Sequence, residues 1–219
     1  MHVVICGGGV IGTCSAYYLA RAGAKVTVIE RAGVANASSG KSGGLLALDW
    51  CAGSALDEMA RRNFGLHREL VKTLRDELHL NWGHRAVDTL SVAASPKRNL
   101  SQYSRLPKPG WLGDRCMVHD HIGTPETTAQ LDPAAFTRAM MHAAETHGAR
   151  LQTGIVDGIV LSQDGRRAGG ALVDGKEMEA DAVLIAMGPW SILACRWLPL
   201  PGTFGRKGHS LVFRFQPEE

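Results

Sequence analysis

The hydrophobic positions of this 219-residue chain begin with a short apolar run that ends in a glycine-rich turn. Val3–Cys6 has no polar residue, which predicts a buried parallel strand, and residues 7–12 read GGGVIG. The pattern then predicts a helix over Val10–Ala22 and a second strand over Lys25–Ile29, which is followed by Glu30. Strand, glycine turn, helix and strand together predict a βαβ unit.

In this context the GxGxxG spacing predicts a dinucleotide site. Gly7 permits the tight turn, Gly9 lets backbone approach a pyrophosphate, and Gly12 allows close packing of helix on strand. The helix N-terminus directs amides and a positive dipole end at the diphosphate. Glu30 accepts hydrogen bonds from ribose hydroxyls and repels a 2′-phosphate, which disfavours NADP. The alternative is a glycine-rich turn in another kind of α/β protein.

The next part of the chain has a less regular pattern. Residues 35–44 are small and polar, which predicts a loop with free amides, and Ser54–His79 repeats apolar residues at the helical period. Thr89–Ala93 reads as a strand, and Ser104–Asp114, with two prolines, reads as a loop.

Regular elements return after Asp132-Pro133, which predicts a helix start that Gly148 brings to an end. Three β runs joined by Asp-Gly turns predict an antiparallel meander: 155–161, 168–173 and 177–179. The apolar run Ala182–Met187 predicts a further parallel strand. A nicotinamide dehydrogenase normally returns to its sheet through helices, so the meander favours a flavin fold over an NAD-dependent dehydrogenase.

Composition and charge narrow the function classes. Lys+Arg 24 against Asp+Glu 21 gives a net charge of +3 without a basic run, so no nucleic-acid partner is expected. No apolar stretch approaches the roughly 18 residues of a membrane span. Met1 leaves no room for a leader before the first strand, and five cysteines without CxxC spacing suit a reducing compartment, so we expect a cytoplasmic protein.

His119-Asp120-His121 offers two interpretations, a metal site or a solvated loop. The loop is favoured because the sequence has no further ligand motif.

The motifs together resemble the FAD-dependent oxidoreductases related to D-amino-acid oxidase, glycine oxidase and sarcosine oxidase. The resemblance covers most of the chain, and the Ala47–Cys51 segment is similar to that of a eukaryotic branch. It is carried by residues 3–12, 28–31, 38–44 and 182–191. It implies an α/β fold with a Rossmann-like FAD-binding domain and a β-meander crossover, over residues 1–50 and 130–198. Residues 51–129 and 199–219 would form part of an α+β substrate or cap domain.

The resemblance also implies where FAD binds. The glycine-serine loop over residues 38–45 would pass beside the flavin diphosphate and ring. The Val156 backbone would meet the adenine, and Gly188 would let the last strand approach the cofactor. Gly188 also ends a buried strand at the edge where α/β proteins bind ligands, although it could be a plain turn glycine. The expected cofactor-binding residues are Gly7, Gly9, Val10, Ile11, Gly12, Glu30, Arg31, Ser38, Ser39, Ser42, Gly43, Gly44, Leu45, Val156, Gly188 and Trp190.

The chemistry implied by the resemblance is hydride transfer from the α-carbon of a small amine or amino acid to the flavin, with oxygen as acceptor. No acid-base dyad is required, and no catalytic residue is assigned. Arg85 and Arg206 are either carboxylate clamps or ordinary surface arginines. Trp50 and Trp190 either line the flavin site or belong to the core. Cys51 invites the hypothesis of a covalent bond to the flavin, but its position alone does not make a thiol reactive.

Relatives in this family continue well beyond the point where this sequence ends. Lys207–Phe215 resembles an early strand of their substrate domain, and such a strand would be left as an exposed edge. The sequence therefore suggests a C-terminally truncated member, either a partial product or a short isoform. The alternative to an oxidase is accordingly a flavin-binding regulatory protein, or an inactive fragment, without a complete catalytic pocket.

Overall fold

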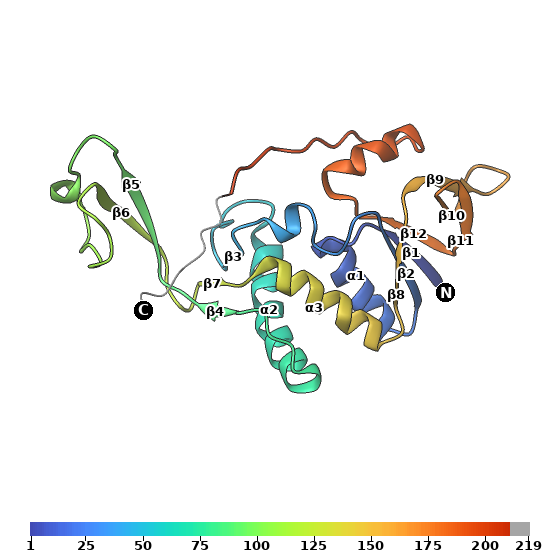
Figure 1. Cartoon of the computed structure of the whole chain (residues 1–219), viewed down its shortest axis with the longest axis horizontal. Helices are drawn as coiled ribbons and strands as arrows, with labels where there is room; N and C mark the ends of the chain where they lie inside the picture. The colour runs from blue at the N-terminus through green and yellow to red at the C-terminus, as the bar shows by residue number, and fades with distance from the viewer. Residues whose placement is uncertain (211–219) are drawn as a thin grey trace. The chain divides into compact units, whose positions relative to one another are not determined.

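The computed structural model describes residues 1–210, and their contacts form two compact units (Figure 1). Unit 1 consists of Met1–Gly43, Leu80–Trp82 and the chain from Asp132 onward. Unit 2 consists of Gly44–His79 and Gly83–Leu131. The domain boundaries expected from the sequence remain a prediction.

A parallel four-stranded sheet is the centre of unit 1. Its strand order is β12 (Ala182–Ile185), β1 (His2–Cys6), β2 (Lys25–Glu30) and β8 (Arg150–Thr153). The apolar residues of β1 and β2 are buried, because neighbouring elements cover both faces of these inner strands. The expected α/β fold class is confirmed.

Two helices of unit 1 pack against each other. They are α1 (Val10–Arg21) and α3 (Pro133–Thr146), which lie side by side in Figure 1. Small buried residues on α1, such as Ala16 and Ala20, allow the close approach, and Phe136 and Met140 of α3 are buried in return. Both helices begin and end within one residue of the expected positions.

The start of α3 depends on one side chain, which leads to a testable prediction. The carboxylate of Asp132 accepts a hydrogen bond from the Ala135 amide at 2.9 Å. Replacing Asp132 with alanine should lower the free energy of unfolding by about 1 kcal/mol, because that amide loses its acceptor. Urea denaturation of the two proteins measures the difference, and an Asp132→Asn variant should recover most of it. Equal stability of the Asp132→Ala and wild-type proteins would contradict this assignment.

An antiparallel meander connects β8 to β12, as the Asp-Gly turns predicted. It consists of β9 (Val156–Leu161), β10 (Ala168–Val173) and β11 (Lys176–Glu179). Asp174 and Gly175 both have positive φ, at 49° and 72°, as the tight turn between β10 and β11 requires. The meander packs its own apolar face on the sheet, where Ala171 and Val173 contact a cluster containing Val4 and Ile29.

Unit 2 combines one long helix with two small antiparallel sheets. The helix is α2 (Asp57–Leu78), whose apolar stripe buries Phe64, Leu70 and Leu74. One sheet has the order β3 (Leu45–Ala47), β7 (Thr128–Gln130) and β4 (Arg85–Ala86). The other is the hairpin of β5 (Thr89–Ala94) and β6 (Cys116–Gly123). Short 3₁₀ turns complete the description at η1 (Ser38–Gly40), η2 (Ser101–Tyr103) and η3 (Gly188–Arg196).

One expectation for unit 2 is wrong. The sequence favoured a solvated loop at His119–His121, but these exposed residues belong to β6, and Asp120 and His121 pair with Ser91 and Leu90 of β5. Within residues 1–210, no group of three metal-ligating side chains comes together.

Residues 207–210 have no regular secondary structure, and the remainder of the strand expected over Lys207–Phe215 lies outside the described residues. No helix in the described range is long and apolar enough to cross a membrane.

A histidine on α2 makes the stability of the protein depend on pH. Burial, with a smaller contribution from the charge on His84, lowers the pKa of His67 from 6.5 to about 4. Between these values the unfolded chain binds a proton that the folded chain does not, so stability falls as the pH drops from ~6.5 toward ~4, by up to about 3 kcal/mol.

Replacing His67 with glutamine should therefore flatten the dependence of unfolding free energy on pH across this window. The measurement is urea denaturation at several pH values, with His142→Gln, an exposed position on α3, as the matched control. An unchanged slope for His67→Gln, or an equally flattened slope for the control, would contradict the assignment.

Candidate functional site

A cavity of about 450 Å³ opens in unit 1 at the carboxyl ends of β12, β1 and β2. Its walls come from the glycine turn, the residues that follow β2, the 36–41 loop, the start of β9 and the residues that follow β12. In the sheet, β2 lies on one side of β1 and β12 on the other, so the strand order changes direction at β1. Open α/β sheets bind ligands at the carboxyl end of such a switch point. The volume lies within the range of small-molecule sites.

The glycine turn brings three chain segments too close together for side chains. Gly7 has a φ of +114°, and a Cβ there would lie 2.5 Å from the Ala186 carbonyl oxygen. A Cβ on Gly12 would overlap the Gly7 carbonyl oxygen, so Gly12 permits packing of α1 against the turn and does not itself line the cavity. Glycine is therefore required at both positions for backbone reasons.

The N-terminus of α1 forms one wall of the cavity through Gly9, Val10 and Ile11. Amides in the first turn of a helix have no intrahelical partner and carry the positive end of the helix dipole. The Ser39 hydroxyl accepts a hydrogen bond from the Val10 amide at 2.9 Å, and a Cβ on Gly9 would lie 3.1 Å from the same oxygen. The Val10 amide is therefore already paired, and this wall presents the positive end of the helix dipole to an anion.

Glu30 is held in the cavity by two backbone amides. One carboxylate oxygen accepts from Gly8 at 2.8 Å and the other from Ala32 at 2.9 Å. A carboxylate has about four lone-pair sites, so both oxygens keep capacity for hydroxyl donors of a ligand. The arrangement holds a fixed negative acceptor beside an electropositive helix terminus.

The cavity lining also contains an arginine stacked on a tryptophan. The guanidinium carbon of Arg31 lies 4.4 Å from the centre of the Trp190 ring. Gly188 has a φ of +55° at the start of η3, a conformation that favours glycine. Arg31, Gly188 and Trp190 all line the cavity, and Trp190 is 41% exposed, so it is not a core residue.

The structure gathers most, but not all, of the expected cofactor-binding residues around this cavity. The expected residues that line it are Gly7, Gly9, Val10, Ile11, Glu30, Arg31, Ser38, Ser39, Val156, Gly188 and Trp190. The expected residues that do not line it are Gly12, Ser42, Gly43, Gly44 and Leu45. Gly44 and Leu45 belong to unit 2, where Leu45 begins β3.

Several cavity residues were not anticipated from the sequence. Ala186 and Met187 follow β12, so the rule that ligands bind at the carboxyl ends of strands would have found them. Gly154, before β9, has no room for a side chain, since a Cβ would lie 2.8 Å from Val173. Nothing in the local sequence distinguishes it from an ordinary turn glycine.

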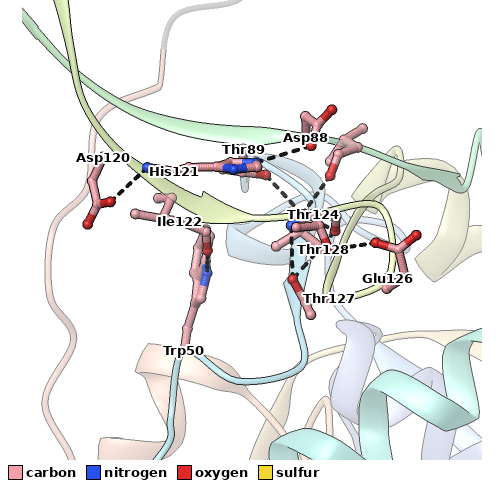
Figure 2. A network of polar contacts seen from close by, with 11 residues as sticks. Trp50, Asp88, Thr89, Asp120, His121, Ile122, Thr124, Glu126, Thr127 and Thr128 are labelled. Atoms are coloured by element: carbon pink, nitrogen blue, oxygen red, sulfur yellow. Dashed lines mark hydrogen bonds and ion pairs between the residues drawn. The ribbon is translucent and has the colours of Figure 1, made fainter. Parts of the chain in front are cut away.

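The other residues considered from the sequence are not among those that line the cavity. The Trp50 indole donates a hydrogen bond to the Ile122 carbonyl at 2.7 Å within unit 2, as Figure 2 shows, and the ring is 47% exposed. Arg85 hydrogen-bonds to the side chain of Gln130, and Arg206 is an exposed residue of the 201–210 segment. The Cys51 thiol is free and does not line the cavity.

The thiols of Cys6 and Cys14, which flank the glycine turn, are unreactive at neutral pH. Burial raises the pKa of Cys6 to about 11 and that of Cys14 to about 12. At neutral pH both are neutral thiols, which are poor nucleophiles.

Comparison with known proteins gives matches along the whole chain. The sequence model of the DAO family, described as FAD dependent oxidoreductase, matches residues 2–219. The protein C1F5.03c of Schizosaccharomyces pombe is 30% identical over 217 residues, which cover 87% of this chain and 55% of that protein. The D-amino acid dehydrogenase of Methylobacterium radiotolerans is 31% identical over 212 residues, covering 75% of this chain and 46% of that protein.

A solved structure supports the fold. Glycine oxidase from Geobacillus kaustophilus matches with a TM-score of 0.74 and 21% identity, over 91% of this chain and 58% of that chain. At this identity the likeness shows the fold alone. The chain thus spans about half the length of the relatives that it matches.

Proposed function

Since the chain belongs to the DAO family of FAD-dependent oxidoreductases, we propose that it oxidises the CH–NH bond of a small amino acid or amine, with oxygen as acceptor. The observation that carries this proposal is the cavity at the sheet switch point, where the glycine turn, the helix N-terminus and Glu30 converge. Bound FAD would supply the redox chemistry by accepting a hydride from the substrate α-carbon.

The residues present fit the ADP part of FAD. The wall formed by Gly7 and Gly9 has no side chains, as close contact with a diphosphate requires. The amides at the start of α1 would hold the diphosphate charge, and Glu30 would accept the ribose hydroxyls. Val156 and the neighbouring Ile155 give an apolar surface for the adenine.

The proposal assigns binding and orientation to this chain. Hydride transfer to flavin needs no acid-base dyad, so residues that exclude water and fix the substrate are sufficient. Within residues 1–210, the cations that line the cavity are Arg31 and Lys41, and neither Arg85 nor Arg206 is among the lining residues.

The acceptor requires a separate test, because the named relatives include both an oxidase and a dehydrogenase. Purified protein is reconstituted with FAD, freed of unbound cofactor and mixed anaerobically with D-amino acids, glycine, sarcosine and polyamines. Loss of the visible flavin absorbance identifies a substrate, and hydrogen peroxide on admitting air identifies oxygen as acceptor. Bleaching without peroxide would favour a dehydrogenase.

A second candidate is a flavin-binding regulatory protein without catalysis. It requires only the cofactor-binding part of the cavity, where the glycine turn and Glu30 converge. Tight FAD binding without bleaching by any amine would support this candidate over the oxidase. Failure to bind FAD would reject both candidates. We also propose the cytoplasm as the compartment, in keeping with five free thiols.

A further inference from the structure

Arg31 and Trp190 come from the ends of two strands that are not neighbours. Arg31 directly follows β2, and Trp190 follows β12 within η3. In the sheet, β1 lies between these two strands. The stacked pair therefore spans the carboxyl end of β1, above the place where the glycine turn begins.

The charge on Arg31 is directed to the aromatic ring and not to an acid. Within residues 1–210, no carboxylate lies at ion-pair distance from Arg31, and its neighbour Glu30 accepts hydrogen bonds from the Gly8 and Ala32 amides. A guanidinium stacked on an indole keeps its N–H donors free at its edges. These donors are available at the cavity rim.

We infer that Arg31 and Trp190 form a clasp that retains the cofactor. This inference rests on the proposed FAD binding and adds a role for the pair acting as a unit. FAD carries a diphosphate, so the Arg31 charge attracts it, and the Trp190 ring holds the guanidinium in place across the crevice. Trp190 is thus a positioning residue that acts through Arg31.

The clasp should control the release of FAD more than its capture, since entry is limited by diffusion and release must break the contact. Breaking the pair from either side should raise the FAD dissociation rate by about fivefold, the value expected for a partly exposed cation–π contact. If the two residues act together, replacing both should raise the FAD dissociation rate little more than replacing one.

The experiment compares Arg31→Met, Trp190→Leu and the double variant. FAD release from each reconstituted protein is followed by the recovery of flavin fluorescence after a large dilution into buffer without FAD. Trp190→Phe keeps an aromatic face and should restore most of the retention. Arg21→Met is the matched control, because Arg21 lies over Tyr17 at 5.9 Å on α1, and neither residue lines the cavity.

A second readout does not depend on the cofactor. In the apoprotein, Arg31→Met should change the tryptophan emission that Trp190→Leu removes, while Arg21→Met should not. Additive effects in the double variant, unchanged release rates or an equal effect of Arg21→Met would overturn the clasp. A wild-type protein that binds no FAD would instead overturn the proposed function.

Discussion

Replacing Gly12 with alanine is expected to destabilise unit 1 by about 3 kcal/mol or more and to prevent retention of FAD. The new Cβ would overlap the carbonyl oxygen of Gly7, which is backbone and cannot rotate away. Relief requires α1 to move from the turn, and this movement would displace the amides that face the cavity. Denaturant unfolding and flavin absorbance after gel filtration measure the two effects.

The chain provides a control for the same substitution in another helix. Gly65 lies within α2, and a Cβ built there meets no atom within 4 Å. Alanine at this position should leave stability unchanged or raise it by about 0.5–1 kcal/mol, since glycine disfavours helices. If Gly12→Ala were as stable as Gly65→Ala, the proposed packing of α1 on the turn would be wrong.

The second large effect is expected for Glu30→Ala, which should weaken FAD binding by about 30- to 100-fold. Two amides would lose their acceptor and the ribose would lose its partner, and a hydrogen bond to a charged group contributes roughly 1.5–3 kcal/mol. Titration of the apoprotein with FAD, followed by quenching of flavin fluorescence, gives the dissociation constant. Glu30→Gln should lie between the wild type and Glu30→Ala, because one acceptor oxygen remains.

Asp164→Ala is the control for loss of a carboxylate that accepts a backbone amide. The Asp164 carboxylate accepts from the Arg166 amide in an exposed turn of the meander, away from the cavity. This variant should keep the wild-type affinity for FAD. A Glu30→Ala protein with unchanged FAD affinity would show that the ribose does not bind at Glu30.

Hydrophobic patterning was enough to predict most elements of unit 1, with β8 as the exception. Runs such as Val3–Cys6 are apolar because both faces of the strand are covered, and Asp132-Pro133 marks a helix start through local hydrogen bonding. Strand β8 was missed because every residue of Arg150–Thr153 is exposed, which leaves no apolar run to find. The position of β8 depends on its pairing with β2, a contact between distant parts of the chain.

The candidate site was predicted in part for the same reason. Glycines and Glu30 carry local signals, since their roles follow from turn geometry and position after a strand. The glycine-serine loop does not stay at the cavity along its whole length, because the chain leaves for β3 at Leu45. The stacking of Arg31 on Trp190 joins residues far apart in sequence, and no local pattern announces it.

The strand order has a consequence for how the protein acquires its cofactor. β1 pairs with β12, so the sheet is complete only when its last strand in chain order joins its first. During synthesis the glycine turn emerges long before residues 182–190, and until then the crevice has only one side. Closing such a long loop is slow compared with forming local contacts. FAD is therefore expected to bind late, as the final step of folding rather than as its nucleus.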